Sequence, residues 1–133
     1  MLKRHEGSEK FCYKCSAGYE TIGVGRNISK SGLGLSDNEI DYLLQNDVSR
    51  VTSELSRKYD WFDDLDSVRR DAMIDISFNL GQTKLRSFVK ALDAMANKKW
   101  EEAANQFMDS RWSRQVGNRA KELTEMIRTG EYC

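Results

Sequence analysis

A carboxylate, a thiol and a hydroxyl stand near the beginning of the sequence in the spacing E-x8-C-x5-T, formed by Glu6, Cys15 and Thr21. Glu6 ends a short predicted helix, whereas Cys15 and Thr21 fall on two adjacent predicted strands, so the three side chains could converge on one small volume. Such a set can protonate a leaving oxygen on one side and handle a nucleophile on the other. Glycoside hydrolysis is therefore our leading hypothesis.

The elements that must position these groups are a short helix and a small antiparallel sheet. The turn Ser16-Ala17-Gly18 joins two alternating segments into a β-hairpin. The glycines of this region suit tight turns and close backbone approach. The predicted bounds are 1–6 for the helix, ending near Gly7, and 11–15, 19–22 and 26–28 for the strands, with a polar loop at 29–34.

The rest of the chain has helical patterns. Ser36 and Glu39 form a capping box that opens a long helix, and apolar residues at spacings of three and four continue it. Asp66 is predicted to cap a second helix, buried at the centre of the helical part, which Gly81 ends. Further helices are expected at 87–96, 99–108 and 118–128, with a short turn at 110–114. A small β region followed by helices indicates an α+β fold.

Length and charge limit the function classes. The 133 residues suffice for one domain with its own core, and 21 basic residues balance 21 acidic ones. No strong field would therefore steer the protein to nucleic acid or to an anionic membrane, and neither is expected as a partner. No apolar run has membrane-spanning length, and the charged start lacks the apolar stretch of a signal peptide. We expect a soluble chain that stays where it is translated.

Four segments together resemble phage T4-type lysozymes, whose motif is E-x8-[D/C]-x5-T, usually with Asp in the middle. These segments are HEGSEKFCYKCSAGYETIGVG, DSVRRDAMIDISFNLG, KKWEEAANQFMDSRW and NRAKELTEMIRTGEY, in the family's order. This chain departs mainly between Asn27 and Leu35, where it is shorter and is expected to lack a small helix. The resemblance implies a single lysozyme-like domain. Its predicted parts are a β lobe at 8–35, a linking helix at 36–58 and a helical lobe at 59–133 packed with helix 1–7.

The resemblance also implies a reaction. Family members cleave the β-1,4 bond between N-acetylmuramic acid and N-acetylglucosamine in peptidoglycan, in a cleft between the lobes and without a metal or organic cofactor. A monomer is expected. Phage members lyse the host cell from within, so synthesis in the bacterial cytoplasm and later action on the wall are implied.

Roles follow residue by residue from the motif. Glu6 would be the general acid, which must stay protonated beside the glycosidic oxygen. Arg119 lies in the NRAK segment, where the family places an arginine that contacts the catalytic glutamate, and is expected to orient it. Thr21 can bind a water or a sugar hydroxyl, although a β-branched residue is also at home in a strand.

Cys15 stands where most of the family has Asp. A thiol with a pKa of about 8.5 is mostly neutral at pH 7, and a nearby carboxylate would raise that pKa. Three options stay open: Cys15 ionises and acts as a base, it attacks as a nucleophile, or activity is weak. Inversion and retention of configuration both remain possible.

Other assignments complete the expectations. Residues implied to line the substrate cleft are Tyr13, Asn27, Phe78, Asn79 and Gln106, although Tyr13 and Phe78 could be core and the amides ordinary surface groups. Arg26 is expected to pair with Asp47 on the long helix, and Trp100 and Trp112 to anchor the core of the helical lobe.

Two rival functions remain. The first is a catalytically weak or inactive peptidoglycan-binding protein on a lysozyme scaffold, kept open by Cys15. The second is a thiol-redox or metal site at Cys12-Tyr13-Lys14-Cys15. Redox C-x-x-C pairs usually sit at a helix N-terminus, and only His5 could add an imidazole, so this rival is poorly supported and no metal is expected. Cys12 is interpreted as a buried small hydrophobe on the opposite face from Cys15.

Overall fold

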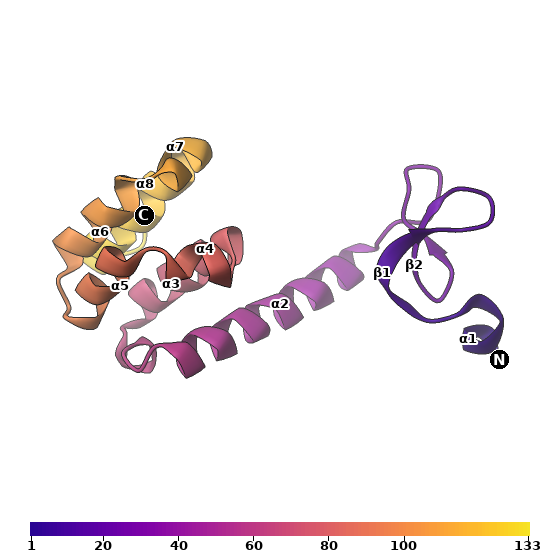
Figure 1. Cartoon of the computed structure of the whole chain (residues 1–133), viewed down its shortest axis with the longest axis horizontal. Coiled ribbons are helices and arrows are strands. Elements are labelled where there is room, and N and C mark those ends of the chain that lie inside the picture. Colours follow the sequence, from indigo (N-terminus) through magenta and orange to yellow (C-terminus); the bar gives the residue numbers. More distant parts are fainter. The chain divides into compact units, whose positions relative to one another are not determined.

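The computed structural model describes residues 1–133 and divides them into two compact units, Met1–Leu44 and Gln45–Cys133 (Figure 1). The division falls within helix α2, Asp37–Lys58, which the sequence predicts as the link between lobes. A small antiparallel sheet belongs to the first unit and a set of helices to the second, which confirms the α+β class. None of these helices combines the length and apolarity that crossing a bilayer requires.

The first unit is built on a three-stranded antiparallel sheet in the order β1-β2-β3. Its elements are α1 (Leu2–Glu6), β1 (Glu9–Lys14), β2 (Glu20–Gly23) and β3 (Arg26–Asn27). The predicted hairpin and third strand are confirmed. Two backbone bonds close the hairpin turn, from Cys15 N–H to the Tyr19 carbonyl at 2.9 Å and from Gly18 N–H to the Cys15 carbonyl at 2.8 Å.

The start of α2 is fixed by the predicted capping box. Glu39 N–H donates to Ser36 Oγ at 3.2 Å, and Ser36 N–H donates to Glu39 Oε1 at 3.0 Å. Arg26 Nη1 also binds Glu39 Oε1, at 2.6 Å. The bond from Ser36 N–H and then the bond from Arg26 hold the pKa of Glu39 below its ordinary value. This cluster joins the end of the sheet to the first turn of the helix.

The predicted pair between Arg26 and Asp47 is wrong. Arg26 follows the turn after β2 and meets Glu39 in the first turn of α2, whereas Asp47 lies eight residues, about 12 Å, further along the helix. Asp47 instead binds Arg50 on the same helix at 2.8 Å.

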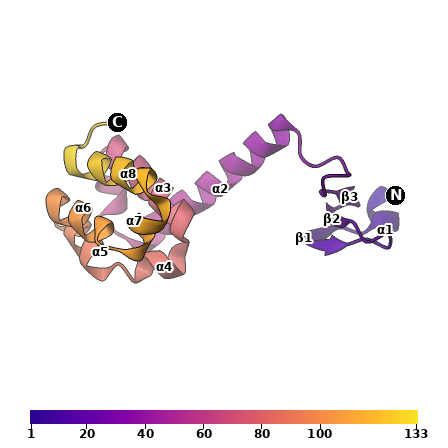
Figure 2. The same cartoon turned by 90° about the horizontal axis from the view of Figure 1, so that it is seen from above.

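The second unit packs short helices around an apolar core (Figure 2). After a 3-10 turn η1 (Phe62–Asp64), its helices are α3 (Ser67–Leu80), α4 (Gln82–Arg86), α5 (Val89–Ala96), α6 (Trp100–Met108), α7 (Arg111–Val116) and α8 (Asn118–Thr129). Helix α6 packs against α5 and α8, and α3 packs against α8. The largest fully buried apolar side chains are Leu55, Phe62, Met73, Ile76, Leu85, Met95, Phe107 and Ile127.

Most helix boundaries agree with the sequence analysis. The Asp66 side chain caps α3 by accepting Arg69 N–H at 3.1 Å, and Gly81 ends that helix as predicted. Burial of α3 is less complete than expected, because Phe78 is exposed. The predicted short turn at 110–114 is wrong: the segment forms α7, which Ser110 caps and which buries Trp112. Helix α4 and turn η1 were not predicted.

Lys98, in the turn between α5 and α6, is the only non-glycine residue with a positive φ, at 59°. A left-handed conformation costs an L-residue about 1–2 kcal/mol and costs glycine nothing. The entropy that glycine adds to the unfolded chain offsets part of this gain. We therefore expect Lys98→Gly to raise the free energy of unfolding by about 0.5 kcal/mol in urea titrations.

Lys99→Gly is the matched control, because Lys99 has an ordinary φ of −90°. It should lower the free energy of unfolding. Equal destabilisation by Lys98→Gly and Lys99→Gly would contradict the interpretation that the backbone of Lys98 is strained.

Candidate active site

Three of the predicted site residues form one cross-strand row. Tyr13 pairs with Thr21, and Thr21 pairs with Asn27 on the next strand. Directly opposed residues of antiparallel strands project to the same face, so these side chains share one side of the sheet. Thr21, in the middle, is buried, and its two neighbours are half-buried. The sheet therefore brings together one predicted catalytic residue and two predicted substrate-binding residues.

Cys15 extends this row at the hairpin turn. It lies two residues after Tyr13 and pairs through its backbone with Tyr19, which keeps it on the face of Thr21. The Thr21 hydroxyl donates to the Tyr19 carbonyl at 2.8 Å, and Thr21 also contributes to lowering the pKa of the Cys15 thiol. The predicted neighbourhood of Cys15 and Thr21 is therefore present.

The hairpin turn stabilises the thiolate form of Cys15. Hydrogen bonds from the backbone N–H groups of Tyr19, the largest contribution, and of Ala17 lower the pKa of Cys15. Burial opposes them in part, and Thr21 lowers the pKa by a smaller amount than burial raises it. The expectation that a neighbouring carboxylate raises this pKa is wrong. Backbone N–H groups of the turn lower this pKa instead, because hydrogen-bond donors favour the charged form of the thiol.

Glu6 is placed by the turn that follows β2. A Cβ atom added to Gly25 would lie 2.6 Å from Glu6 Oε2 and 3.3 Å from Glu6 Cβ, so only a glycine leaves room for this side chain. The φ of Gly25 is +68°, which also favours glycine. Glu6 is exposed. Thus Glu6 lies at one end of β2, Cys15 lies at the turn before the other end, and Thr21 is on the strand itself.

Asn27 fastens the loop after the sheet. Its Oδ1 accepts the N–H of Ser29 at 2.9 Å and the Ser29 hydroxyl at 2.6 Å, and its carbonyl accepts Gly34 N–H at 3.1 Å. Gly32 lies against the Asn27 side chain with no room for a Cβ atom. The amide oxygen of Asn27 thus binds the loop, whereas its Nδ2 group donates to no protein acceptor.

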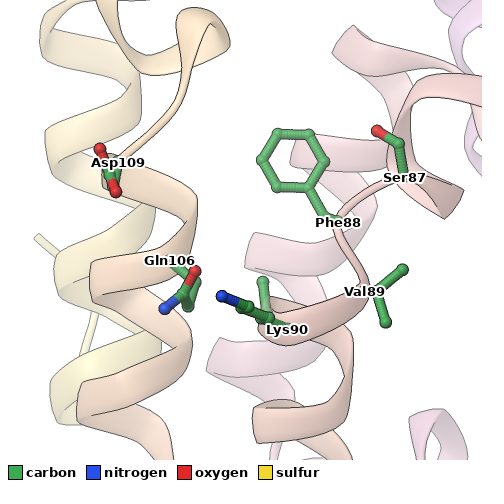
Figure 3. A pocket seen from close by; sticks show the side chains of 7 residues that line it. Ser87, Phe88, Val89, Lys90, Gln106 and Asp109 are labelled. Atoms are coloured by element: carbon green, nitrogen blue, oxygen red, sulfur yellow. The ribbon is translucent and has the colours of Figure 1, made fainter.

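The second unit holds the other predicted substrate-binding residues. Asn79 Oδ1 accepts the indole N–H of Trp112 at 2.7 Å, and Phe78 is exposed on α3. Gln106 lines a pocket of about 370 Å³ together with Phe88 and Lys90. Figure 3 shows Gln106 and Lys90 pointing toward one another across this pocket. Because Phe78 is exposed, it does not belong to the core.

Arg119 has a partner that the sequence analysis missed. Its Nε and Nη2 bind Asp75 Oδ1 at 2.8 and 2.5 Å, which joins α8 to α3 within the second unit. Asp75 and Arg119 are 44 residues apart, and nothing in the local sequence signals the pair. The role of Arg119 beside Glu6 stays a prediction.

The C-x-x-C motif gains no support as a redox or metal site. All three cysteines are free, and no three His, Cys, Asp or Glu side chains are grouped to hold a metal ion. Cys12 is exposed, so its interpretation as a buried residue is wrong. The register is irregular between Glu9 and Tyr13, and an alternation argument fails at such a bulge.

Comparison with known proteins identifies the class. The sequence model of the phage lysozyme family matches residues 3–129, so the chain belongs to that family. The chain is 28% and 27% identical to probable T4-type lysozymes 1 and 2 of Dictyostelium discoideum, over 98% of its length and 92% of theirs. It is 26% identical to the pre-baseplate central spike protein Gp5 of Enterobacteria phage T4, over 98% of its length but 27% of that protein. Family membership supports a peptidoglycan hydrolase.

The alignments also show a difference in length between this chain and its relatives. They span 156 or 157 positions, more than the 133 residues of this chain, so the relatives carry segments that it lacks. The relatives are therefore longer, whereas a shortening between Asn27 and Leu35 stays a prediction.

The thiol environment can be tested by alkylation in a variant that keeps only Cys15, made with Cys12→Ser and Cys133→Ser. The rate of reaction with iodoacetamide rises as thiolate forms, so its pH midpoint should lie below the value of about 8.5 of a free thiol. Thr21→Val, which removes the hydroxyl, should raise the midpoint, whereas Thr21→Ser should keep it low. A midpoint at or above that of a free thiol would contradict the stabilisation by the turn.

The contact between Gly25 and Glu6 predicts an effect on peptidoglycan hydrolysis. Gly25→Ala must displace the carboxyl group and should lower the initial rate of clearing of purified sacculi at least tenfold. Gly23→Ala is the control, because Gly23 has a similar φ of +66° but nothing within 4 Å of an added Cβ. If both variants lose the same activity, backbone strain alone accounts for the effect and the contact has no role.

Proposed function

We propose that the protein is an N-acetylmuramidase that cleaves the β-1,4 bond between N-acetylmuramic acid and N-acetylglucosamine in peptidoglycan. The observation that carries the proposal is the arrangement around β2: Glu6 against the turn after the strand, Thr21 on it, and a thiol with lowered pKa at the turn before it. Membership of the phage lysozyme family supports the same substrate.

Glu6 is proposed as the general acid. A sugar oxygen leaves readily only when protonated, so the carboxyl group must deliver a proton as the glycosidic bond breaks. Gly25 leaves the space in which Glu6 lies, and this close backbone contact restricts where the side chain can go. Positioning of this kind is itself a contribution to rate.

Cys15 and Thr21 are proposed to act on the nucleophile. The thiolate, favoured by the turn, takes a proton from a water, and the Thr21 hydroxyl helps hold that water. Strand β2 has four residues and is about 10 Å long, with Glu6 and Cys15 at opposite ends. Space for a water between acid and base is the requirement of an inverting hydrolase, so we favour this role over direct attack by sulfur.

The remaining residues are proposed to position substrate and acid. Arg119 orients the Glu6 carboxyl group, as the resemblance implies. Its guanidinium already binds Asp75. The proposed role therefore requires Arg119 to bind two carboxylates, Asp75 and Glu6. The proposed sugar contacts are Tyr13, Asn27, Phe78, Asn79 and Gln106.

The biological role follows the family. We propose a monomeric enzyme that is synthesised in the cytoplasm of a phage-infected bacterium and reaches the wall after release. In this role it would contribute to lysis of the host cell.

Clearing of purified peptidoglycan sacculi across pH tests the mechanism. Wild type should clear, Glu6→Gln should lose at least 100-fold in rate, and Cys15→Ala should lose at least tenfold. Because the base acts only when ionised, the acidic limb of the wild-type profile should follow the pKa of Cys15. Cys15→Asp should move that limb to lower pH, since a carboxylate ionises near pH 4.

Cys15→Ser is the control, since a hydroxyl of similar size does not ionise in this range. Full activity of Cys15→Ala would contradict the role of the thiol. No clearing by wild type at any pH would favour a binding protein without activity.

A further inference from the structure

The second unit contains a hollow of about 280 Å³ with two tryptophans in its wall. Trp61 precedes η1, and Trp100 is the first residue of α6. Asp64, from η1, and Lys98, from the turn between α5 and α6, also line the hollow. It shares no residue with the catalytic assignment, which lies in the first unit.

Both indole rings are held by neighbouring groups. Tyr59 lies 5.2 Å from Trp61 between ring centroids, and the guanidinium of Arg69 lies 4.1 Å from the centroid of Trp100. Arg69 is itself fixed by a bond of 2.6 Å from its Nε to the Ile127 carbonyl. Rings that are already ordered lose little entropy when a ligand binds them.

Among the polar side chains that line the hollow, only Asp66 has a hydrogen-bonded protein partner, Arg69. Trp112 donates its indole N–H to Asn79, whereas neither Trp61 nor Trp100 donates to a protein acceptor, and neither indole nitrogen is sealed off as a buried unsatisfied group. Asp64 and Lys98 take part in none of the salt bridges. A carboxylate, an ammonium and two N–H donors therefore remain available.

This combination fits a sugar ring. A pyranose has apolar C–H faces that contact an indole and a rim of hydroxyl groups that bind carboxylates, and pockets with aromatic walls and few polar groups are typical ligand sites. The volume of about 280 Å³, just below the usual range of about 300–1,000 Å³, suits one ring. We propose that this hollow binds an N-acetylated amino sugar of a glycan strand, at a distance in sequence from the cleaving residues; the choice of polymer rests on the proposed function.

Neighbouring hollows connect this site to a predicted substrate-binding residue. Trp100 also lines a second hollow, of about 450 Å³, which Gln106 lines as well. Gln106 then lines the pocket of Figure 3. Each hollow thus shares one lining residue of α6 with the next. A second contact on an insoluble polymer raises the effective concentration of substrate at the first.

The test uses the Glu6→Gln variant, which should not cleave, titrated with chitotriose and followed by NMR of the indole N–H groups. The three tryptophans give three signals, assigned with Trp61→Phe and Trp100→Phe. We expect the Trp61 and Trp100 signals to shift at millimolar chitotriose. Trp112, bonded to the predicted substrate residue Asn79, reports binding elsewhere on the unit. If saturating sugar shifts neither Trp61 nor Trp100, the site is excluded.

A charge-matched pair of variants tests the geometry. Asp64→Asn should raise the dissociation constant read from the Trp61 signal about tenfold, because it removes the charge from a hydrogen-bond acceptor of the sugar hydroxyls. Asp60→Asn removes the same charge from an exposed residue outside the hollow and should change it less than twofold. Equal effects of the two variants would overturn the assignment of Asp64.

The outcomes separate this inference from the proposed function. If wild type clears sacculi but the Trp61 and Trp100 signals do not shift, the sugar site is refuted and the proposed enzymatic activity is supported. If both tryptophan signals shift but wild type does not clear sacculi, sugar binding by the second unit is supported and the proposed enzymatic activity is refuted.

Discussion

The backbone N–H groups of the turn between β1 and β2 lower the pKa of the Cys15 thiol, and the proposed catalysis depends on this interaction. A cysteine at this position would otherwise present a mostly neutral thiol at neutral pH. Donors from Tyr19 and Ala17 favour its ionised form, and Thr21 adds a hydroxyl from the adjacent strand. The hairpin turn thus makes the Cys15 thiol more acidic, whereas an aspartate side chain is acidic without such help.

Close backbone approach also places Glu6, the proposed acid. Gly25 leaves space for Glu6 at the far end of β2, and the row Tyr13–Thr21–Asn27 fixes the face between the two groups. Asn27 and the pair of Arg26 with Glu39 then connect this small sheet to its loop and to the start of α2. A unit with few buried side chains is thus ordered largely by polar contacts.

Local chemistry made much of the fold predictable. The capping box of Ser36 and Glu39 and the cap at Asp66 act within three residues, so their patterns can be recognised in the sequence. Helix α7 was missed because burial of Trp112, a tertiary effect, helps stabilise a segment too short to show a periodic pattern. Exposed Cys12 was missed because the irregular register of β1 breaks simple alternation.

The proximity of several predicted site residues could be foreseen from the sequence, but the electrostatics around Cys15 could not, and the catalytic roles stay predictions. The motif spacing led to Glu6, Cys15 and Thr21, and strand register led Tyr13 and Asn27 to the same face. Backbone donors have no sequence signature, so the lowered pKa of Cys15 could not be foreseen. The partner of Arg119, Asp75, is remote in sequence and was equally hidden.

The configuration of the first-formed product tests the central claim most directly. If the Cys15 thiolate activates a water, that water attacks the face opposite the leaving oxygen and the β bond yields an α anomer. Proton NMR of a soluble peptidoglycan fragment, recorded in the first minutes of cleavage, distinguishes the two anomers before they equilibrate. The account predicts the α product. A β product, with sugar bound covalently to Cys15, would contradict it.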